Sequence, residues 1–281
     1  MALGPAQIAG LMMIGSGLAH ATVNAIFKAG GSDKMSGRAM IDGSSALLVM
    51  PLALFVPLPQ HAWIWLAGSL AAHMVYLSCL VRAFALADMS AVYPVMRGSA
   101  PVIAAVGSVL MLGEPITLAI VLGIVCVTLG TLLVALRNAP PLHALGWALG
   151  TGAAIAAYTV IDASGVRAAP STLSYVAWNF MITGVGIGGY FALRRGREFL
   201  VAARTQWRAG LVAGSLSIVS YGLALGAYRQ GNVAQLASLR ETSIVFGLII
   251  AAVFLREHVN RTRAAGGAMI ALGAAVLIVL S

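Results

Sequence analysis

Charged residues are scarce in this chain. Only 9% of its 281 residues are Asp, Glu, Lys or Arg, whereas a soluble domain carries roughly 25%. At the same time 60% of the residues are hydrophobic, which is more apolar surface than one soluble core of this length could bury. Lipid must therefore be the solvent for much of the chain, and we expect an integral membrane protein.

Acidic residues and cysteines are also few. Eight acids against 17 Lys and Arg give a net charge of +9. The basic residues lie in short loops and form no basic face with interleaved aromatics, so this charge does not indicate a nucleic-acid partner. Cys79 and Cys126 lie inside apolar segments and match no metal spacing, so we expect no disulfide, no bound metal and no other cofactor.

Long apolar runs are what the sequence does contain. Each is about 20 residues, the length that an α-helix needs to cross a bilayer. Ten transmembrane helices are predicted, at residues 6–28, 37–57, 62–84, 90–112, 116–136, 142–165, 172–193, 207–229, 233–254 and 260–280. The longest loop is expected at 195–206. The predicted fold class is an all-α integral membrane protein without a soluble domain.

The two halves of the chain repeat one another. Corresponding residues recur in the same order, 135 to 146 positions later: Gly17, Ala67-Gly68-Ser69-Leu70, Arg97 and Glu114 recur as Gly152, Ala213-Gly214-Ser215-Leu216, Arg240 and Glu257. Five spans per copy is an odd number, so the second copy enters the membrane from the opposite side. We expect two inverted five-helix repeats, residues 1–138 and 139–281, around a central cavity, the usual build of a secondary transporter.

Lys and Arg are distributed unevenly among the predicted loops. Counted along the chain, the odd loops hold nearly all of them, and the even loops hold only Arg167 and Arg229. Basic residues in short loops mark the cytoplasmic side of a membrane. The odd loops are therefore expected in the cytoplasm, with both termini on the outer side of a cytoplasmic (inner) membrane.

Ionisable residues inside the predicted spans are the first candidates for a functional site, because they are costly there unless paired or hydrated. Arg97 and Arg240 lie at matching depths in spans four and nine, and Tyr93 precedes Arg97 by one turn. A guanidinium can bind a substrate carboxylate bidentately. The alternative is a structural pair, of Arg97 with a carbonyl or an acid and of Arg240 with Glu241 or another helix.

Glu241 is the candidate for proton coupling, because it lies well inside span nine. The neighbouring Arg240 argues against that role, since a nearby cation favours the ionised carboxylate. Asp162 lies near the predicted end of span six. For Asp162, snorkelling to the surface or pairing with a loop is the favoured interpretation.

Further polar residues share helix faces that are expected to point into the bundle, because polar side chains avoid lipid. An interhelical hydrogen bond is the alternative role for each. The predicted substrate-binding residues are His20, Asn24, His73, Tyr76, Tyr93, Arg97, Tyr158, Tyr221 and Arg240. This mixture of tyrosines and a few donors suits a small amphipathic solute, such as an amino acid with an apolar side chain.

A family resemblance rests on motifs in both halves: Tyr93-Pro94, Pro101, Gly113-Glu114-Pro115, Arg240-Glu241-Thr242 and Arg256-Glu257. They resemble the drug/metabolite transporter (DMT) superfamily, EamA type, and the chain is similar to YddG-type exporters of aromatic and other amino acids. The resemblance implies a central cavity built mainly from spans one, three, four, six, eight and nine. It implies structural roles for Glu114 and Glu257. Ser243 lies near the position where the family usually has a helix-kinking proline. This departure argues against a symmetric kink in span nine.

The leading prediction is therefore a secondary transporter that exports small metabolites, above all aromatic or other apolar amino acids, by alternating access. It is expected to act as a facilitator, to need only a small-molecule substrate and membrane lipid as partners, and to require no oligomer. A proton-coupled drug or metabolite antiporter working through Glu241 is the alternative. A structural subunit, or an intramembrane enzyme built on His20, His73 and Cys79, is more remote, and no enzyme activity is expected.

Overall fold

The computed structural model describes residues 4–29, 34–135, 140–254, 256 and 258–280. Within these ranges the regular secondary structure is entirely helical. The elements are α1 (Pro5–Ala29), α2 (Lys34–Phe55), α3 (Trp63–Leu86), α4 (Met89–Leu112), α5 (Leu118–Ala135), α6 (Leu142–Ala168), α7 (Thr172–Thr183), the π-helical η1 (Gly184–Gly188), α8 (Gly189–Arg195), α9 (Arg197–Gln230), α10 (Val233–Leu239), α11 (Thr242–Val253) and α12 (Arg261–Val279).

Most of these helices are long and apolar enough to cross a membrane. Eight described stretches meet that criterion, and two shorter apolar helices, Met40–Phe55 and Leu118–Val134, coincide with predicted spans two and five. Many large apolar side chains are exposed on the outside, as expected for a surface in contact with lipid. An all-helical, multi-pass membrane protein is thus confirmed, while the count of ten spans stays a prediction.

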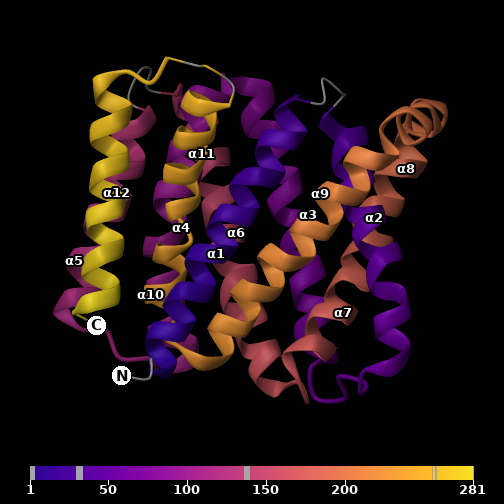
Figure 1. The fold of residues 1–281 in the computed structure, drawn as a ribbon, viewed down its shortest axis with the longest axis horizontal. Coiled ribbons are helices and arrows are strands. Elements are labelled where there is room, and N and C mark those ends of the chain that lie inside the picture. The colour runs from indigo at the N-terminus through magenta and orange to yellow at the C-terminus, as the bar shows by residue number, and fades with distance from the viewer. Residues whose placement is uncertain (1–3, 30–33, 136–139, 255, 257, 281) are drawn as a thin grey trace.

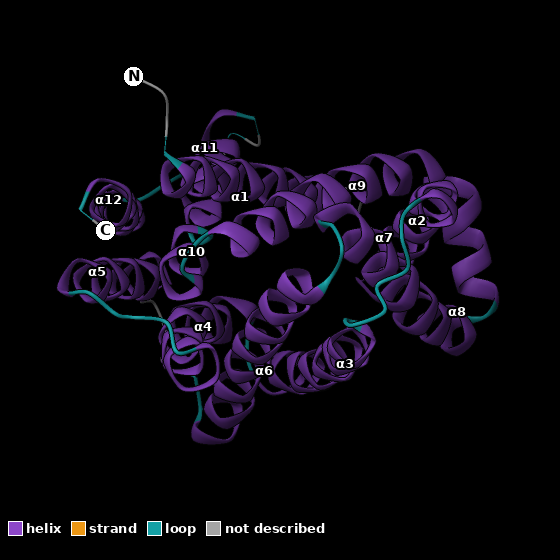
Figure 2. Cartoon of the chain, turned by 90° about the horizontal axis from the view of Figure 1, so that it is seen from below, coloured by secondary structure: helices purple, strands orange, loops and turns teal. Residues whose placement is uncertain are grey.

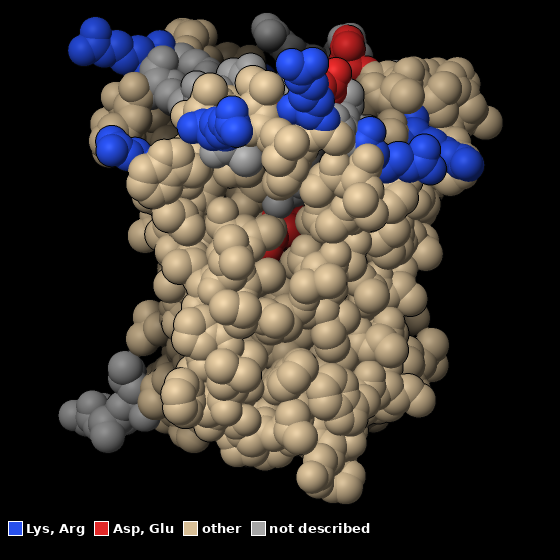
Figure 3. All heavy atoms as spheres, turned by 90° about the vertical axis from the view of Figure 1, so that its right-hand side faces the viewer, with Lys and Arg blue, Asp and Glu red and all other residues tan. Residues whose placement is uncertain are grey.

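The charged residues are concentrated at one end of the molecule. On the face shown in Figure 3, Lys and Arg gather along the top, and the rest is almost uncharged except for acidic atoms at the bottom of a central hollow. In Figure 1 the first turn of α1 and the last turn of α12 lie at the opposite end. The ends of the helical bundle therefore differ strongly in charge.

The helices form an elongated bundle with a pair at each end. Helix α5 packs on α12 at one end, and α2 packs on α7 and η1 at the other (Figures 1 and 2). Between them, α6 packs on α3 and α4, and α1 packs on α9 and α11. This arrangement places α4, α6, α9 and α10 around the middle of the molecule.

The predicted loop at 195–206 is wrong. Helix α9 begins at Arg197, directly after Gly196, which has the positive φ of 48° that glycine readily adopts. The following residues contain no proline or glycine until Gly210. The low hydropathy of this stretch placed it outside the predicted spans. A helix can nevertheless continue beyond the membrane, where charged residues are acceptable.

A break interrupts the second-half helix that corresponds to α4, so the two halves are not symmetric here. Helix α4 runs without interruption through Pro94 and Pro101, whereas the helix of the second half breaks between α10 and α11 although it contains no proline. At the break, the Glu241 N–H donates to the Ser238 carbonyl (3.1 Å) and the Ser243 N–H to that of Arg240 (3.1 Å). These three-residue hydrogen bonds are tighter than α-helical ones, and they turn the chain at mid-helix.

Candidate functional site

The break between α10 and α11 is tied to α4 by an ion pair. Arg97 Nε lies 3.0 Å from Glu241 Oε2, and Arg97 Nη2 donates a 2.9 Å hydrogen bond to Ser243 Oγ. The two charged side chains are only 11% and 4% exposed. Of the two roles predicted for Arg97, the geometry fits the structural pair, and its partner is the acid that the sequence suggested for proton coupling.

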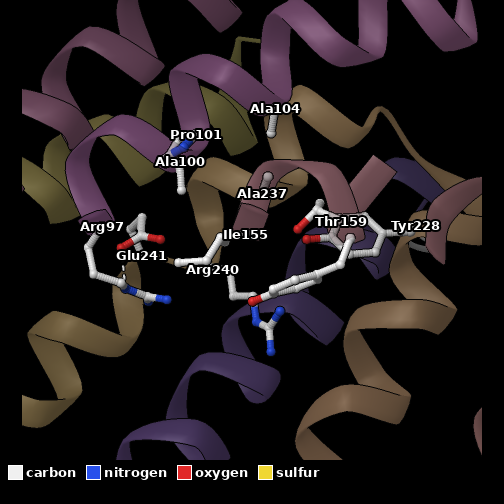
Figure 4. Close-up of a pocket in the computed structure, with 11 residues that line it drawn as sticks. Arg97, Ala100, Pro101, Ala104, Ile155, Thr159, Tyr228, Ala237, Arg240 and Glu241 are labelled. Carbon is white, nitrogen blue, oxygen red and sulfur yellow. Dashed lines mark ion pairs between the residues drawn. The ribbon is translucent and has the colours of Figure 1, made fainter. Parts of the chain in front are cut away.

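A small cavity lies beside this pair (Figure 4). Its walls come from α4, α6, α9, α10 and the break, and the lining residues are Arg97, Ala100, Pro101, Ala104, Ile155, Tyr158, Thr159, Tyr228, Ala237, Arg240 and Glu241. Its volume of about 20 Å³ is enough for a water molecule and too small for a metabolite. In this conformation the cavity therefore has room for a water-sized molecule and not for the substrate of a transporter.

Arg240 gives the cavity an unbalanced positive charge. Its side chain points away from the Arg97–Glu241 pair (Figure 4), and its guanidinium carbon lies 5.2 Å from the ring centre of Tyr221. The ion pairs of the described residues do not include Arg240, and its buried Nε has no hydrogen-bond partner. The residues that line the cavity thus include two guanidinium groups and one carboxylate, and the predicted alternative pair of Arg240 with Glu241 does not form.

Aromatic side chains from three helices meet next to Arg240. His73 of α3 stacks on Tyr158 of α6, with ring centres 4.2 Å apart and an interplanar angle of 18°. Tyr76 approaches the same tyrosine edge-on at 6.0 Å, and Tyr221 of α9 lies edge-on to His73 at 6.5 Å. Four residues predicted from the sequence therefore form one aromatic cluster, and Tyr158 joins it to the cavity.

Asp162 does not snorkel. Helix α6 continues to Ala168, and the Asp162 side chain is 0% exposed. Its Oδ1 accepts hydrogen bonds from Tyr175 Oη (2.7 Å) and Asn179 Nδ2 (3.3 Å), and its Oδ2 accepts one from Tyr221 Oη. The sequence interpretation was wrong because it ended the helix too early and so placed this residue too close to the surface.

A hydrogen-bonded chain leads from Asp162 to the aromatic cluster. Asn179 Nδ2 also donates to Ser69 Oγ (3.2 Å), and Ser69 contacts His73 Nδ1 through both its hydroxyl (3.4 Å) and its carbonyl (2.8 Å). Neither Ser69 nor Tyr175 was a predicted site residue. The only sequence signal for Ser69 was its place in the repeated Ala-Gly-Ser-Leu motif, which also occurs outside any site.

Three predicted residues, Tyr93, Asn24 and His20, line neither the cavity nor the aromatic cluster described above. Tyr93 packs among apolar side chains of α3, α4 and α6, including Val92 and Ala148. Asn24 is exposed, and His20 is half-buried on α1. Neither His20 nor Asn24 is among the residues that line the cavity.

Glu114 lies at the end of the molecule where α9 passes into α10. Its Oε1 pairs with Arg167 Nη2 at 2.6 Å, and its Oε2 accepts from the backbone N–H of Val233 at 2.7 Å. Arg167 also donates to the carbonyls of Tyr228 and Gly231. These contacts fit the structural role that the resemblance implies for Glu114, whereas Glu257 lies outside the described residues.

Comparisons with known proteins bear on both halves of the chain. The model of the EamA-like transporter family matches residues 142–279, and no curated protein matches the chain. Solved structures contribute 29 matching chains. For one crystal structure, the matched region covers 96% of this chain and 95% of the chain in that structure, with a TM-score of 0.72 and 20% sequence identity. At that identity the likeness shows the fold alone, and it extends over the first half as well.

Proposed function

Because residues 142–279 belong to the EamA-like transporter family of the drug/metabolite transporter superfamily, we propose that the protein is a secondary transporter whose substrates are amino acids with aromatic or other apolar side chains. The family indicates a membrane transporter of small molecules and gives no support to the enzyme alternative. The substrate class and the mechanism are inferred from the site.

The unpaired Arg240 beside the aromatic cluster carries the proposal. A guanidinium without an acidic partner attracts an anionic group and matches a carboxylate in a bidentate geometry. The rings of His73, Tyr76, Tyr158 and Tyr221 offer apolar and π surfaces a few ångströms away. A solute with a carboxylate at one end and an apolar or aromatic group at the other satisfies both requirements.

Equivalent contacts in the two halves support an inverted repeat of residues 1–138 and 139–281. A Cβ on Gly17 of α1 would lie 2.9 Å from Thr242 Oγ1 at the break, and a Cβ on Gly152 of α6 would lie 2.1 Å from Ser99 Oγ of α4. Likewise α3 packs on α6 as α9 packs on α1. In such repeats, one bundle rocks against the other around a central site, which gives alternating access.

The distribution of Lys and Arg supports the orientation. The basic end of the bundle in Figure 3 is opposite the start of α1 and the end of α12, which favours a cytoplasmic basic end and outer termini. We propose that the transporter works in the cytoplasmic membrane and exports its substrates. Glu241 is engaged by Arg97, so the alternative of proton antiport through Glu241 finds no support in the geometry.

The test is transport by purified protein in proteoliposomes. Radiolabelled tryptophan, phenylalanine, leucine and glutamate are offered with and without a proton gradient, and we expect flux of the apolar amino acids down their own gradients. Arg240→Gln should abolish most of this flux, while the exposed Arg208→Gln serves as a matched control for loss of one positive charge. If no amino acid moves through the wild-type protein, the proposed substrate class is wrong.

A further inference from the structure

We propose that Asp162 is a proton-binding site linked through the Tyr221 hydroxyl to occupancy of Arg240, so that a proton and an anionic ligand bind together. The linkage rests on the proposed function, because the ligand is the carboxylate-bearing solute inferred above. The proton site itself rests only on the position and partners of Asp162.

The first step is that residue 162 is an acid, although an amide could also make interhelical hydrogen bonds at this position. Asp162 is fully buried inside an apolar bundle, and the ion pairs of the described residues do not include it. An ionised carboxylate without a paired cation is costly in the membrane interior. The hydrogen bonds that join α6 to α7 and α9 need only a polar side chain, so ionisation is the property that an acid adds.

The second step is the set of groups that face this carboxylate. Helix α7 contributes Tyr175 and Asn179, α9 contributes Tyr221, and α3 contributes Ser69 and, behind it, His73. The cation that lies next to this network is Arg240, across the ring of Tyr221. Arg97 of α4 and Glu241 lie beyond it and neutralise one another. Arg240 is therefore the group whose charge can most readily compensate Asp162.

The third step is what a bound proton changes. In the structure, the Asp162 carboxylate accepts all three of its hydrogen bonds and donates none. When a proton from the aqueous phase binds Oδ2, the new O–H must find an acceptor. The Asn179 amide nitrogen cannot accept, and the Tyr175 hydroxyl contacts the other carboxylate oxygen, Oδ1, whereas Tyr221 contacts Oδ2. Tyr221 is left as the acceptor.

The Tyr221 hydroxyl then has its own hydrogen free for another acceptor. Because Arg240 lies over the same ring, a ligand carboxylate held by Arg240 is a suitable acceptor near it. The ligand carboxylate also neutralises Arg240, whose charge otherwise compensates Asp162. A second negative charge nearby favours the protonated form of Asp162. Both effects make the ligand and the proton bind cooperatively, and linkage requires that each strengthens the binding of the other equally.

The proton site is tested without any ligand. Infrared spectra of the protein in lipid are recorded over a pH series for the wild type, Asp162→Asn and Asp88→Asn, which removes an exposed acid before α4. We expect a carboxyl band that follows pH in the wild type and in the Asp88 variant and is absent from the Asp162 variant. Identical bands in all three proteins would overturn the assignment.

The linkage is tested by proton uptake on ligand addition in weakly buffered detergent solution. Tryptophan should cause uptake in the wild type, whereas tryptamine, which lacks the carboxylate, should not. Asp162→Asn and Tyr221→Phe should both lose the uptake, although the second keeps the Asp162 carboxyl band and so reports that the acid is still in place. Undiminished uptake in either variant contradicts the linkage. If tryptophan binds to neither wild type nor variants, the proposed substrate is wrong, while the infrared series still decides the proton site.

Discussion

Two arginines at equivalent positions of the two halves have different partners. Arg97 is held by Glu241 and Ser243, whereas Arg240 lies against an aromatic ring without an ion pair among the described residues. The first therefore ties α4 to the break between α10 and α11, and the second is the group that we propose for the ligand carboxylate. Substitutions at the two positions should separate stability from transport.

Replacing Arg240 with Gln removes the charge that we propose binds the substrate carboxylate. A hydrogen bond to a charged group contributes about 1.5–3 kcal/mol, so we expect transport of carboxylate-bearing substrates to fall by roughly 10- to 100-fold. Initial rates in proteoliposomes measure the loss. Wild-type rates in this variant, with Arg208→Gln as the control, would contradict a role in binding.

Replacing Arg97 with Gln leaves the Glu241 carboxylate buried without its partner. Breaking a buried pair on one side costs about 3–5 kcal/mol, so thermal unfolding in detergent should begin at a clearly lower temperature than for wild type or Arg240→Gln. The double variant with Glu241→Gln should recover part of that stability. A single variant as stable as wild type would show that the pair contributes little.

At the scale of helices, close packing depends on glycines at backbone contacts. A Cβ on Gly130 of α5 would lie 2.7 Å from the Gly266 carbonyl oxygen and 2.9 Å from the Ile270 nitrogen of α12. Neither backbone atom can move away without separating the helices. By contrast, a Cβ on Gly146 of α6 would meet no atom within 4 Å.

The same substitution should therefore have opposite effects at these two glycines. Gly146→Ala is expected to be neutral or slightly stabilising, because alanine favours a helix by about 1 kcal/mol over glycine. Gly130→Ala should destabilise by about 1–3 kcal/mol through overpacking. Thermal unfolding of both variants measures the difference, and equal transition temperatures would argue against tight α5–α12 contact.

The transmembrane segments could be predicted from the sequence because apolar length is a local property. The predicted span at 90–112 differs from α4 by one residue at its start. The break at Arg240 and Glu241 could not be predicted in this way, since it depends on Arg97 of α4 and on the close approach of Gly17 of α1. Pro94 and Pro101 would indicate a break in α4 instead, yet α4 is continuous through both prolines.

The candidate site was predictable in its residue types and less so in its partners. Stacking of His73 on Tyr158 follows from two polar faces that both avoid lipid. The burial of Asp162 depended on where α6 ends, and the ends of helices are the least certain part of a sequence prediction. The contribution of Ser69 required knowing that α3 and α7 are neighbours, which no local pattern contains.

At the scale of the whole molecule, the charge asymmetry gives a test of orientation. A reporter that is active only outside the cytoplasm, fused after Ser281, should be active if the basic end of the bundle is cytoplasmic. The same reporter inserted after Gly196, in the turn between α8 and α9, should be inactive. The reverse pattern would place the termini in the cytoplasm and invert the proposed direction of export.

The contacts of Arg167 at the opposite end have a consequence for how the bundle opens. This guanidinium binds Glu114 and two backbone carbonyls beside the turn from α9 to α10, and its side chain is 32% exposed. Water can take over every one of these hydrogen bonds as the helices part, whereas the Arg97–Glu241 pair at mid-bundle has no such substitute. The helices around Arg167 should therefore separate over a low energy barrier. Breaking the buried Arg97–Glu241 pair should present the higher barrier and so limit the rate of the transport cycle.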